Sequence, residues 1–183
     1  YSKKRKVITT AAYTAVKREF KFFDEWSARR YQKVISLIEE ETEVYITDAD
    51  KAEVKFIVRT TSDTPFGNYY LYDEPSHTLT HLADVSPWLK SDMLCAMQPI
   101  TYTSRDGLVI HGYLTLPQNK QAQNLPLVVN PHGGPWARDT WRFNPEVQFL
   151  ANRGYAVLQM KFRGSTGYGK QFWEASFKQW GKK

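Results

Sequence analysis

The chain has 183 residues, of which 42% are hydrophobic and 15% are aromatic. This length is enough for one ordinary domain or two small ones, and this composition excludes a disordered chain. The formal net charge is +6, with 14 basic and 14 acidic residues in 1–90, and 11 basic against 5 acidic residues in 91–183. Cys95 is the single cysteine, which excludes an intrachain disulfide and a cysteine metal cluster.

The basic excess lies in the second half, where it is scattered among the expected strands and helices. The run from Lys3 to Lys6 is interpreted as a solvated charge run rather than a nuclear signal or a phosphate contact. We therefore expect no nucleic-acid partner. No apolar run approaches membrane-spanning length, so we expect no membrane partner either. The residues contain no signal peptide, the sequence does not choose between cytoplasm and periplasm, and a homo-oligomer is left open.

The N-terminal region predicts one strand and one helix. Residues 7–13, "VITTAAY", are typical of a strand. In residues 22–40, apolar residues recur at the spacing of one helix face, from Tyr31 to Ile38. Asp24 and Glu25 suit the first turn of this helix electrostatically, whereas the acidic run 39–41 does not suit its last turn.

After this helix the pattern changes to short β-type runs separated by turn-rich segments. The expected strands are "EVYIT", "VKFIVRT", "NYYLYD" and "TLTHL", and the turns are "DADK", "SDTPFG" and "EPSH". Four short strands in about forty residues is the size of one β-propeller blade or of half a sandwich. The rhythm alone leaves both architectures open.

Residues 84–100 lose the alternation and hold two prolines, which indicates a passage into a second domain. We expect a hairpin around an Asp106–Gly107 turn, a buried strand, a helix from Asn144 to Gly154, a second buried strand, and a final helix. The expected segments are 100–117, 125–130, 144–154, 155–162 and 170–181, the last with Trp173, Phe177 and Trp180 on one face. This order predicts the opening of a doubly wound α/β sheet. Two buried strands and a hairpin are too few to stand alone, so we expect the chain to be a piece of a longer one.

The residues that carry chemistry follow the first buried strand: His132, Gly133, Gly134 and Pro135. The crevice of an open α/β sheet lies at the carboxyl ends of its strands. Adjacent glycines let the backbone approach a ligand and aim N–H groups at it, which suits an oxyanion hole. The alternative is a tight glycine turn with no ligand, and the strand before and helix after favour the oxyanion hole.

A complete catalytic triad is not predicted. Ser165 is the one serine with a glycine two residues away, Gly167, but its other flank is Arg163, so it is interpreted as part of a structural loop. No histidine follows His132, which excludes the chain order serine, acid, histidine. The histidines do not make metal-ligand spacing with carboxylates, and no phosphate-binding loop is complete, so we expect no metal and no cofactor.

Taken together, these motifs resemble a known family. The segment from Leu125 to Gly181, with its HGGP and FRGSTGYG motifs, closely resembles the start of the catalytic domain of prolyl oligopeptidase family serine peptidases. The most similar branch is the acylaminoacyl-peptidase and dipeptidyl-aminopeptidase-like one, and residues 100–117 resemble the first hairpin of the same domain. The resemblance implies a β-propeller followed by an α/β-hydrolase domain. It assigns 1–90 to the C-terminal part of the propeller and 91–183 to the N-terminal part of the hydrolase domain.

The resemblance also implies roles for the glycine loop. The backbone N–H of Gly134 corresponds to an oxyanion-hole donor, while His132 and Gly133 form the scaffold of the substrate-binding loop. His132 stands where other branches place a tyrosine, and Asn130–Pro131 replaces a more usual apolar pair. The triad residues have no positions in this chain.

The predicted function is that of part of a serine peptidase, which hydrolyses short peptides through an acyl-enzyme. Two alternatives remain open: an esterase-like α/β-hydrolase and a non-catalytic propeller interaction module. Because the triad is missing, the 183-residue chain alone is predicted to be inactive.

Overall fold

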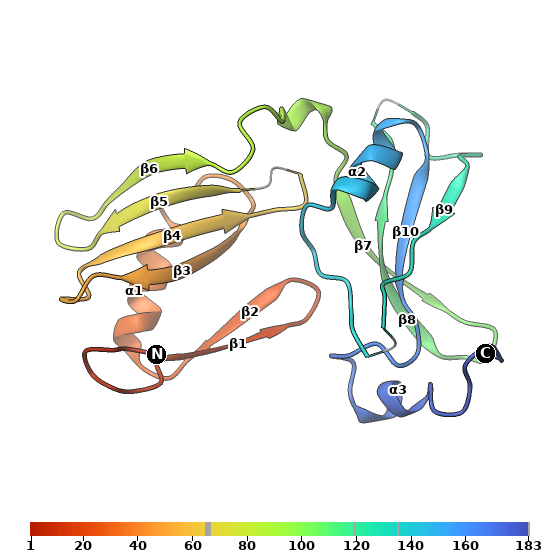
Figure 1. Cartoon of the computed structure of the whole chain (residues 1–183), viewed down its shortest axis with the longest axis horizontal. Helices are drawn as coiled ribbons and strands as arrows, with labels where there is room; N and C mark the ends of the chain where they lie inside the picture. The colour runs from red at the N-terminus through yellow and green to blue at the C-terminus, as the bar shows by residue number, and fades with distance from the viewer. Residues whose placement is uncertain (65–66, 119, 135, 183) are drawn as a thin grey trace. The chain divides into compact units, whose positions relative to one another are not determined.

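A computed structural model describes residues 1–64, 67–118, 120–134 and 136–182. The chain divides into two compact units, Tyr1–Lys90 and Ser91–Lys183, whose elements can be followed in Figure 1. The assignment of these ranges to a propeller and a hydrolase domain stays a prediction. Pro135 of the HGGP motif, Lys183, and the middle of the "SDTPFG" turn lie outside the described residues.

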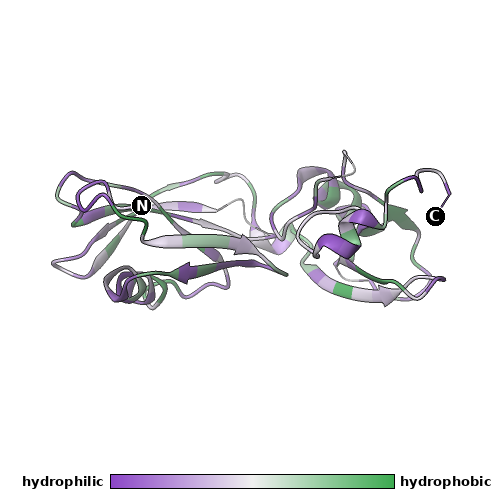
Figure 2. Ribbon diagram, turned by 90° about the horizontal axis from the view of Figure 1, so that it is seen from below, coloured by the Kyte–Doolittle hydropathy of each residue, from purple (hydrophilic) through white to green (hydrophobic). Residues whose placement is uncertain are grey.

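The first unit is built around a four-stranded antiparallel sheet in sequence order. Its strands are β3 (Glu43–Ala49), β4 (Lys55–Thr61), β5 (Asn68–Asp73) and β6 (Thr78–Asp84). The four expected β-type runs are therefore confirmed as strands. Burial alternates along β4, because successive side chains of a strand point to opposite faces. Both hydrophobic and hydrophilic residues occur along the strands of the sheet (Figure 2).

The N-terminal part of this unit differs from the prediction in two respects. A hairpin of β1 (Thr10–Thr14) and β2 (Arg18–Phe22) precedes the helix, and β2 was not predicted. The helix α1 is shorter than expected, Glu25–Ile35. Asp24 caps its N-terminus by accepting a hydrogen bond from the Ser27 N–H. The helix ends before the acidic run 39–41, whose charge opposes the negative end of the helix dipole.

One face of the sheet packs against α1 to form the core of this unit. Val34 of the helix is fully buried and lies in one cluster with residues of three strands. The strand residues of this cluster are Val44, Phe56, Val58 and Tyr72. Their alternate positions along β4, Phe56 and Val58, reflect the period of two that the sequence predicts.

The second unit contains a mixed four-stranded sheet in the order β7-β8-β10-β9. Its elements are β7 (Met97–Thr103), β8 (Val109–Thr115), β9 (Leu127–Val129), α2 (Pro145–Asn152), β10 (Ala156–Lys161) and α3 (Lys170–Glu174), preceded by a 3-10 turn, η1 (Ser91–Met93). The strands β7 and β8 form the expected hairpin, with Gly107 at φ +83° in its turn. β9 and β10 are parallel and α2 connects them, which is the βαβ connection that α/β sheets use.

The two helices of this unit differ in how well they follow the sequence. Asn144 caps α2 and Pro145 begins it, as predicted. Val147 and Ala151 of α2 pack on Val157 of β10. The expected helix 170–181 is wrong beyond Glu174, because α3 ends there and turns follow, with Lys178 at φ +57°.

Candidate functional site

The HGGP loop begins directly after the parallel strand β9, at its carboxyl end. Gly134 adopts φ +63°, a left-handed conformation that glycine tolerates and other residues rarely adopt. A Cβ added to Gly133 or Gly134 would meet no atom within 4 Å. Within the described part of the chain, the N–H groups of both glycines have no hydrogen-bond acceptor. The loop therefore presents open backbone donors to an incoming group.

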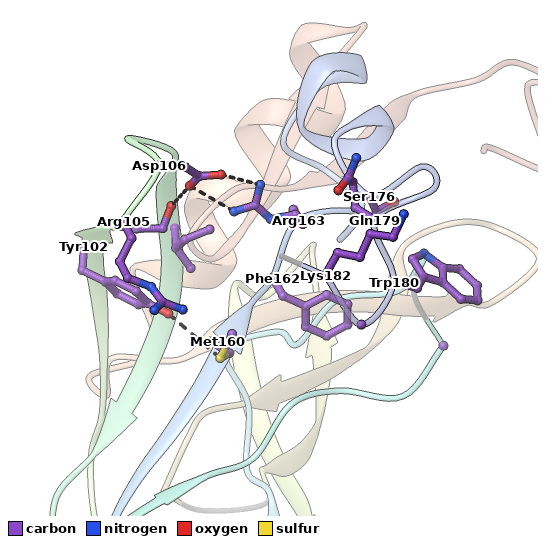
Figure 3. Close-up of a pocket in the computed structure, with 14 residues that line it drawn as sticks. Tyr102, Arg105, Asp106, Met160, Phe162, Arg163, Ser176, Gln179, Trp180 and Lys182 are labelled. Carbon is purple, nitrogen blue, oxygen red and sulfur yellow. Dashed lines mark hydrogen bonds and ion pairs between the residues drawn. The ribbon is translucent and has the colours of Figure 1, made fainter.

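Gly134 lines a cavity of about 820 Å³ in the second unit (Figure 3). Its walls include Tyr102, Met160, Phe162 and Trp180, which make much of the lining apolar. Met160 alternates with the residues of β10 that face α2, so the cavity lies on the sheet face opposite that helix. A largely apolar cavity with a few polar groups is the usual form of a small-molecule or peptide site.

The carboxylate at the rim of this cavity, Asp106, is held by Arg163. Two hydrogen bonds join them, from Arg163 Nη1 to Oδ2 at 2.8 Å and from Nη2 to Oδ1 at 3.1 Å. The hydrogen bonds from Arg163 and Ser104 hold the pKa of Asp106 well below its usual range. Because this carboxylate stays ionised and engaged, it is poorly suited to accept or deliver protons in catalysis.

His132 contacts Ser165, a pair that the sequence analysis did not foresee. His132 Nε2 lies 2.7 Å from Ser165 Oγ, and the imidazole stacks on the Phe162 ring at 4.4 Å between centroids. Ser165 Oγ donates to the carbonyl oxygen of Phe162 at 2.6 Å. A hydroxyl has one proton, so Ser165 accepts its second hydrogen bond from the Nε2–H of His132.

This direction is opposite to that of a serine nucleophile, whose hydroxyl gives its proton to histidine. Ser165 is also completely buried, so a substrate carbonyl does not reach it. The structure thus places the serine and the histidine together without making a catalytic dyad. Their sequence separation of 33 residues carries no motif that predicts the contact.

A second feature that the sequence did not reveal is the buried lysine of β10. Lys161 is 1% exposed, and its Nζ lies 3.2 Å from the centroid of the Tyr113 ring. Burial and the positive charge of Arg138 lower the pKa of Lys161 to about 7, while Asp139 opposes the shift. Nearby, burial and the charge of Lys161 also lower the pKa of His111.

Among the described residues, no group of three or more histidine, cysteine, aspartate or glutamate side chains is arranged to hold a metal ion. His77 contacts Tyr72 and His81 contacts Asp84, so the two histidines have separate partners. In the same part of the chain, no helix has both the length and the apolar character needed to cross a bilayer.

Comparison with known proteins shows which class of proteins the chain is similar to. Residues 141–183 match the model of the "Prolyl oligopeptidase family" of peptidases. Dipeptidyl aminopeptidase BIII of Pseudoxanthomonas mexicana is 45% identical over 122 residues, which are 63% of this chain and 18% of that protein. The chain is thus related to serine peptidases, which are hydrolases. Within that class, the resemblance to the prolyl oligopeptidase family that the sequence predicts is confirmed.

Solved structures support the same relation. The acylaminoacyl peptidase of Pyrococcus horikoshii is similar with a TM-score of 0.55 and 25% identity, over 75% of this chain and 21% of that one. The dipeptidyl peptidase 4 of Porphyromonas gingivalis shares the fold over 91% of this chain and 24% of its own, with a TM-score of 0.63 and 13% identity. The chain spans about a fifth or less of the length of the curated relatives it matches.

Proposed function

We propose that this chain is part of a serine peptidase that hydrolyses peptide bonds of short peptides through an acyl-enzyme, and that the N–H of Gly134 contributes to its oxyanion hole. The observation that carries the proposal is the pair of open backbone donors on a loop at the carboxyl end of a parallel strand. Donors fixed in place before the reaction stabilise the charge that develops on the carbonyl oxygen.

The two units fit the domains that this function needs. The sheet β3-β4-β5-β6 has the four antiparallel strands of a propeller blade, which supports its assignment to the end of a β-propeller. The parallel β9–α2–β10 connection supports the assignment of 91–183 to the start of an α/β-hydrolase domain. The names of the relatives, dipeptidyl aminopeptidase and acylaminoacyl peptidase, support the choice of peptides, rather than esters or other amides, as the proposed substrates.

The first test uses a longer protein that contains residues 1–183. We expect this protein to react with a fluorophosphonate at one serine outside these residues and to cleave dipeptide or acylated-peptide amides faster than simple esters. The 183-residue chain should remain unlabelled under the same conditions. Labelling of Ser165 would contradict the proposal, and a longer protein without hydrolase activity would favour the interaction module. A strong preference for esters would favour the esterase.

The second test addresses Gly134 with a matched pair of substitutions. An L-residue at φ +63° costs about 1–2 kcal/mol, so the loop of Gly134→Ala should relax out of the conformation that aims the N–H. Returning to that conformation in the transition state should then lower kcat by roughly fivefold to thirtyfold. Gly133→Ala is the control, because its added Cβ also meets open space and its φ is not positive. Equal kcat values for the two variants in an otherwise active enzyme would remove Gly134 from the proposal.

A further inference from the structure

Hydrogen bonds join the loop after β9 to the loop after β10. They include His132 Nε2 to Ser165 Oγ at 2.7 Å, Thr166 N–H to the Ala137 carbonyl oxygen at 2.9 Å, and Arg138 Nη2 to Tyr168 Oη at 3.0 Å. The first contact is two residues before Gly134 and the others are three and four residues after it. Gly133 and Gly134 have no side chains to pack, so the orientation of their peptide depends on the anchors at both ends.

His132 is the anchor on the N-terminal side, and it contacts the peptide unit that joins Gly133 to Gly134. Its Nδ1 lies 3.2 Å from the carbonyl oxygen of Gly133, which belongs to the same planar peptide unit as the N–H of Gly134. The carbonyl and N–H of a trans peptide point in opposite directions. Because Nε2–H is donated to Ser165 and a carbonyl oxygen only accepts, the Nδ1 contact is a hydrogen bond only if Nδ1 also carries a proton. In that form it holds the Gly133 carbonyl toward the imidazole and aims the Gly134 N–H away from it.

Ser165 in turn fixes the imidazole. Stacking on Phe162 sets the plane of the ring. The ring can still flip by roughly 180° about χ2, which exchanges its two faces without changing the plane. The hydrogen bond between Nε2 and the buried Ser165 hydroxyl selects one of the two ring orientations. The hydroxyl is itself held by its bond to the Phe162 carbonyl, and the tight turn of Ser165 N–H to the same oxygen, at 2.9 Å, adds to this restraint.

We propose that Ser165 is a positioning residue of the oxyanion loop, which acts through His132 to aim the N–H of Gly134. The serine of the second glycine loop thus contributes to transition-state stabilisation without touching substrate. This inference rests on the proposed function. It differs from a purely structural role because it predicts a loss in the chemical step of correctly folded enzyme.

The experiment uses the active longer protein and counts active sites by stoichiometric titration with a fluorophosphonate. Ser165→Ala removes the hydroxyl, and His132→Phe keeps a ring for stacking on Phe162 but has no donor. Ser27→Ala is the control, because the Ser27 hydroxyl is also buried and hydrogen-bonded but lies in the first unit, outside the oxyanion loop. If Ser165→Ala fails to fold, His132→Phe still tests the same hydrogen bond.

We expect Ser165→Ala and His132→Phe each to lower kcat per titrated site roughly tenfold, with KM changed less than twofold, because a misplaced donor weakens the transition state selectively. Ser27→Ala should keep kcat per titrated site within about threefold of the wild type, because it leaves both glycine loops unchanged. The double variant Ser165→Ala/His132→Phe should lose no more than the larger single loss. A peptide boronic acid should bind more weakly in parallel with kcat/KM, whereas a cleavage product should bind unchanged.

The alternative results overturn the inference. Unchanged kcat per site in both single variants, with only a lower melting temperature or fewer titratable sites, would leave Ser165 a purely structural residue. Losses that multiply in the double variant would show that the two residues act separately. An inactive, untitratable wild-type longer protein would overturn the proposed function together with this inference, whereas the first two results leave the proposed function intact.

Discussion

Arg30 in the first unit and Lys161 in the second are both buried cations, and their surroundings differ. Arg30 is 7% exposed, its Nε lies 3.2 Å from Glu74 Oε2, and its guanidinium stacks on Trp26 and Phe56. Burial lowers its pKa and Glu74 opposes that shift. Lys161 faces the ring of Tyr113 and makes no ion pair within the described residues. The first unit pairs its buried cation with a carboxylate, whereas in the second unit the buried cation contacts an aromatic ring.

The difference does not extend to the other buried polar groups. Among the described residues, each unit has buried side-chain atoms without a hydrogen-bond partner: Arg30 Nη2, Thr42 Oγ1 and Arg59 Nε in the first, and Thr115 Oγ1, Asp139 Oδ2 and Gln159 Oε1 in the second. Unpaired buried polar groups lower stability, and in folded proteins they are often found where function requires them. Lys161 precedes the second glycine loop by few residues, and Asp139 ends the first. The comparison teaches that the two units differ in how the buried cation itself is compensated, by a carboxylate in the first unit and by an aromatic ring in the second.

The largest expected change in stability follows from removing Glu74, the ion-pair partner of Arg30. Glu74→Ala leaves a buried guanidinium without its carboxylate and should destabilise the first unit by about 2–4 kcal/mol. Lys55→Ala is the control, because its ion pair with Asp73 is largely exposed and should contribute less than about 1 kcal/mol. Urea unfolding followed by the fluorescence of this unit measures both. Equal losses would show that burial does not decide the strength of the Arg30 pair.

The second prediction is a gain in stability rather than a loss. The pKa of Lys161 is lowered to about 7, so between pH 7 and about 10 the unfolded chain binds a proton that the folded chain does not. Stability from this group therefore rises with pH through that window and is lowest below pH 7. Lys161→Met removes the cost and should stabilise the protein by about 1–3 kcal/mol at pH 6, with a smaller gain at pH 9 and none above about pH 10.

Melting temperatures at pH 6, 7.5 and 9 measure this prediction. Lys170→Met is the control, because its side chain is 80% exposed and should show no such pH dependence. A Lys161→Met variant that is destabilised equally at every pH would mean that the contact of the ammonium with Tyr113 outweighs its burial. The buried cations of the two units would then be alike.

The sequence predicts the regular elements of both units because their signals are local. Alternation in 43–82 gives four strands, and the Asp106–Gly107 turn gives the hairpin of β7 and β8. The strand β2 was missed because its alternation, Phe20 and Phe22, merges with the start of the helical pattern. The helix expected over 170–181 failed for a related reason: aromatic spacing of three and four residues does not prevent a positive φ at Lys178.

The candidate site could be predicted only in part. The glycine pair is visible because its two residues are adjacent, and the resemblance to the family leads to Gly134 as the proposed donor. The contact of His132 with Ser165 is not visible, because it joins two loops through the tertiary fold and depends on one shared carbonyl, that of Phe162. The shifted pKa of Lys161 is also hidden, since in sequence it is an ordinary lysine at the end of an apolar strand.

The smallest expected change in stability comes from the two helix caps, which the local sequence does predict. Asp24 caps α1 and Asn144 caps α2, so replacing either residue with alanine should cost about 1 kcal/mol. Burial disfavours the charged form of Asp24, but hydrogen bonds from Ser27 and Arg5 outweigh it and lower its pKa. The extra stability from its charge is therefore present above about pH 4 and is lost as the pH falls through the lowered folded-state pKa.

Unfolding free energies at pH 7 and pH 3 separate the two caps. The difference between wild type and Asp24→Ala should shrink in acid, whereas the difference for Asn144→Ala should stay constant, because an amide does not titrate in this range. Asp24→Asn is the matched control, since it keeps the cap but removes the charge and should behave like the cap of α2. A cap at Asp24 whose contribution is the same at both pH values would show that the hydrogen bond from Ser27, and not the charge, carries its effect.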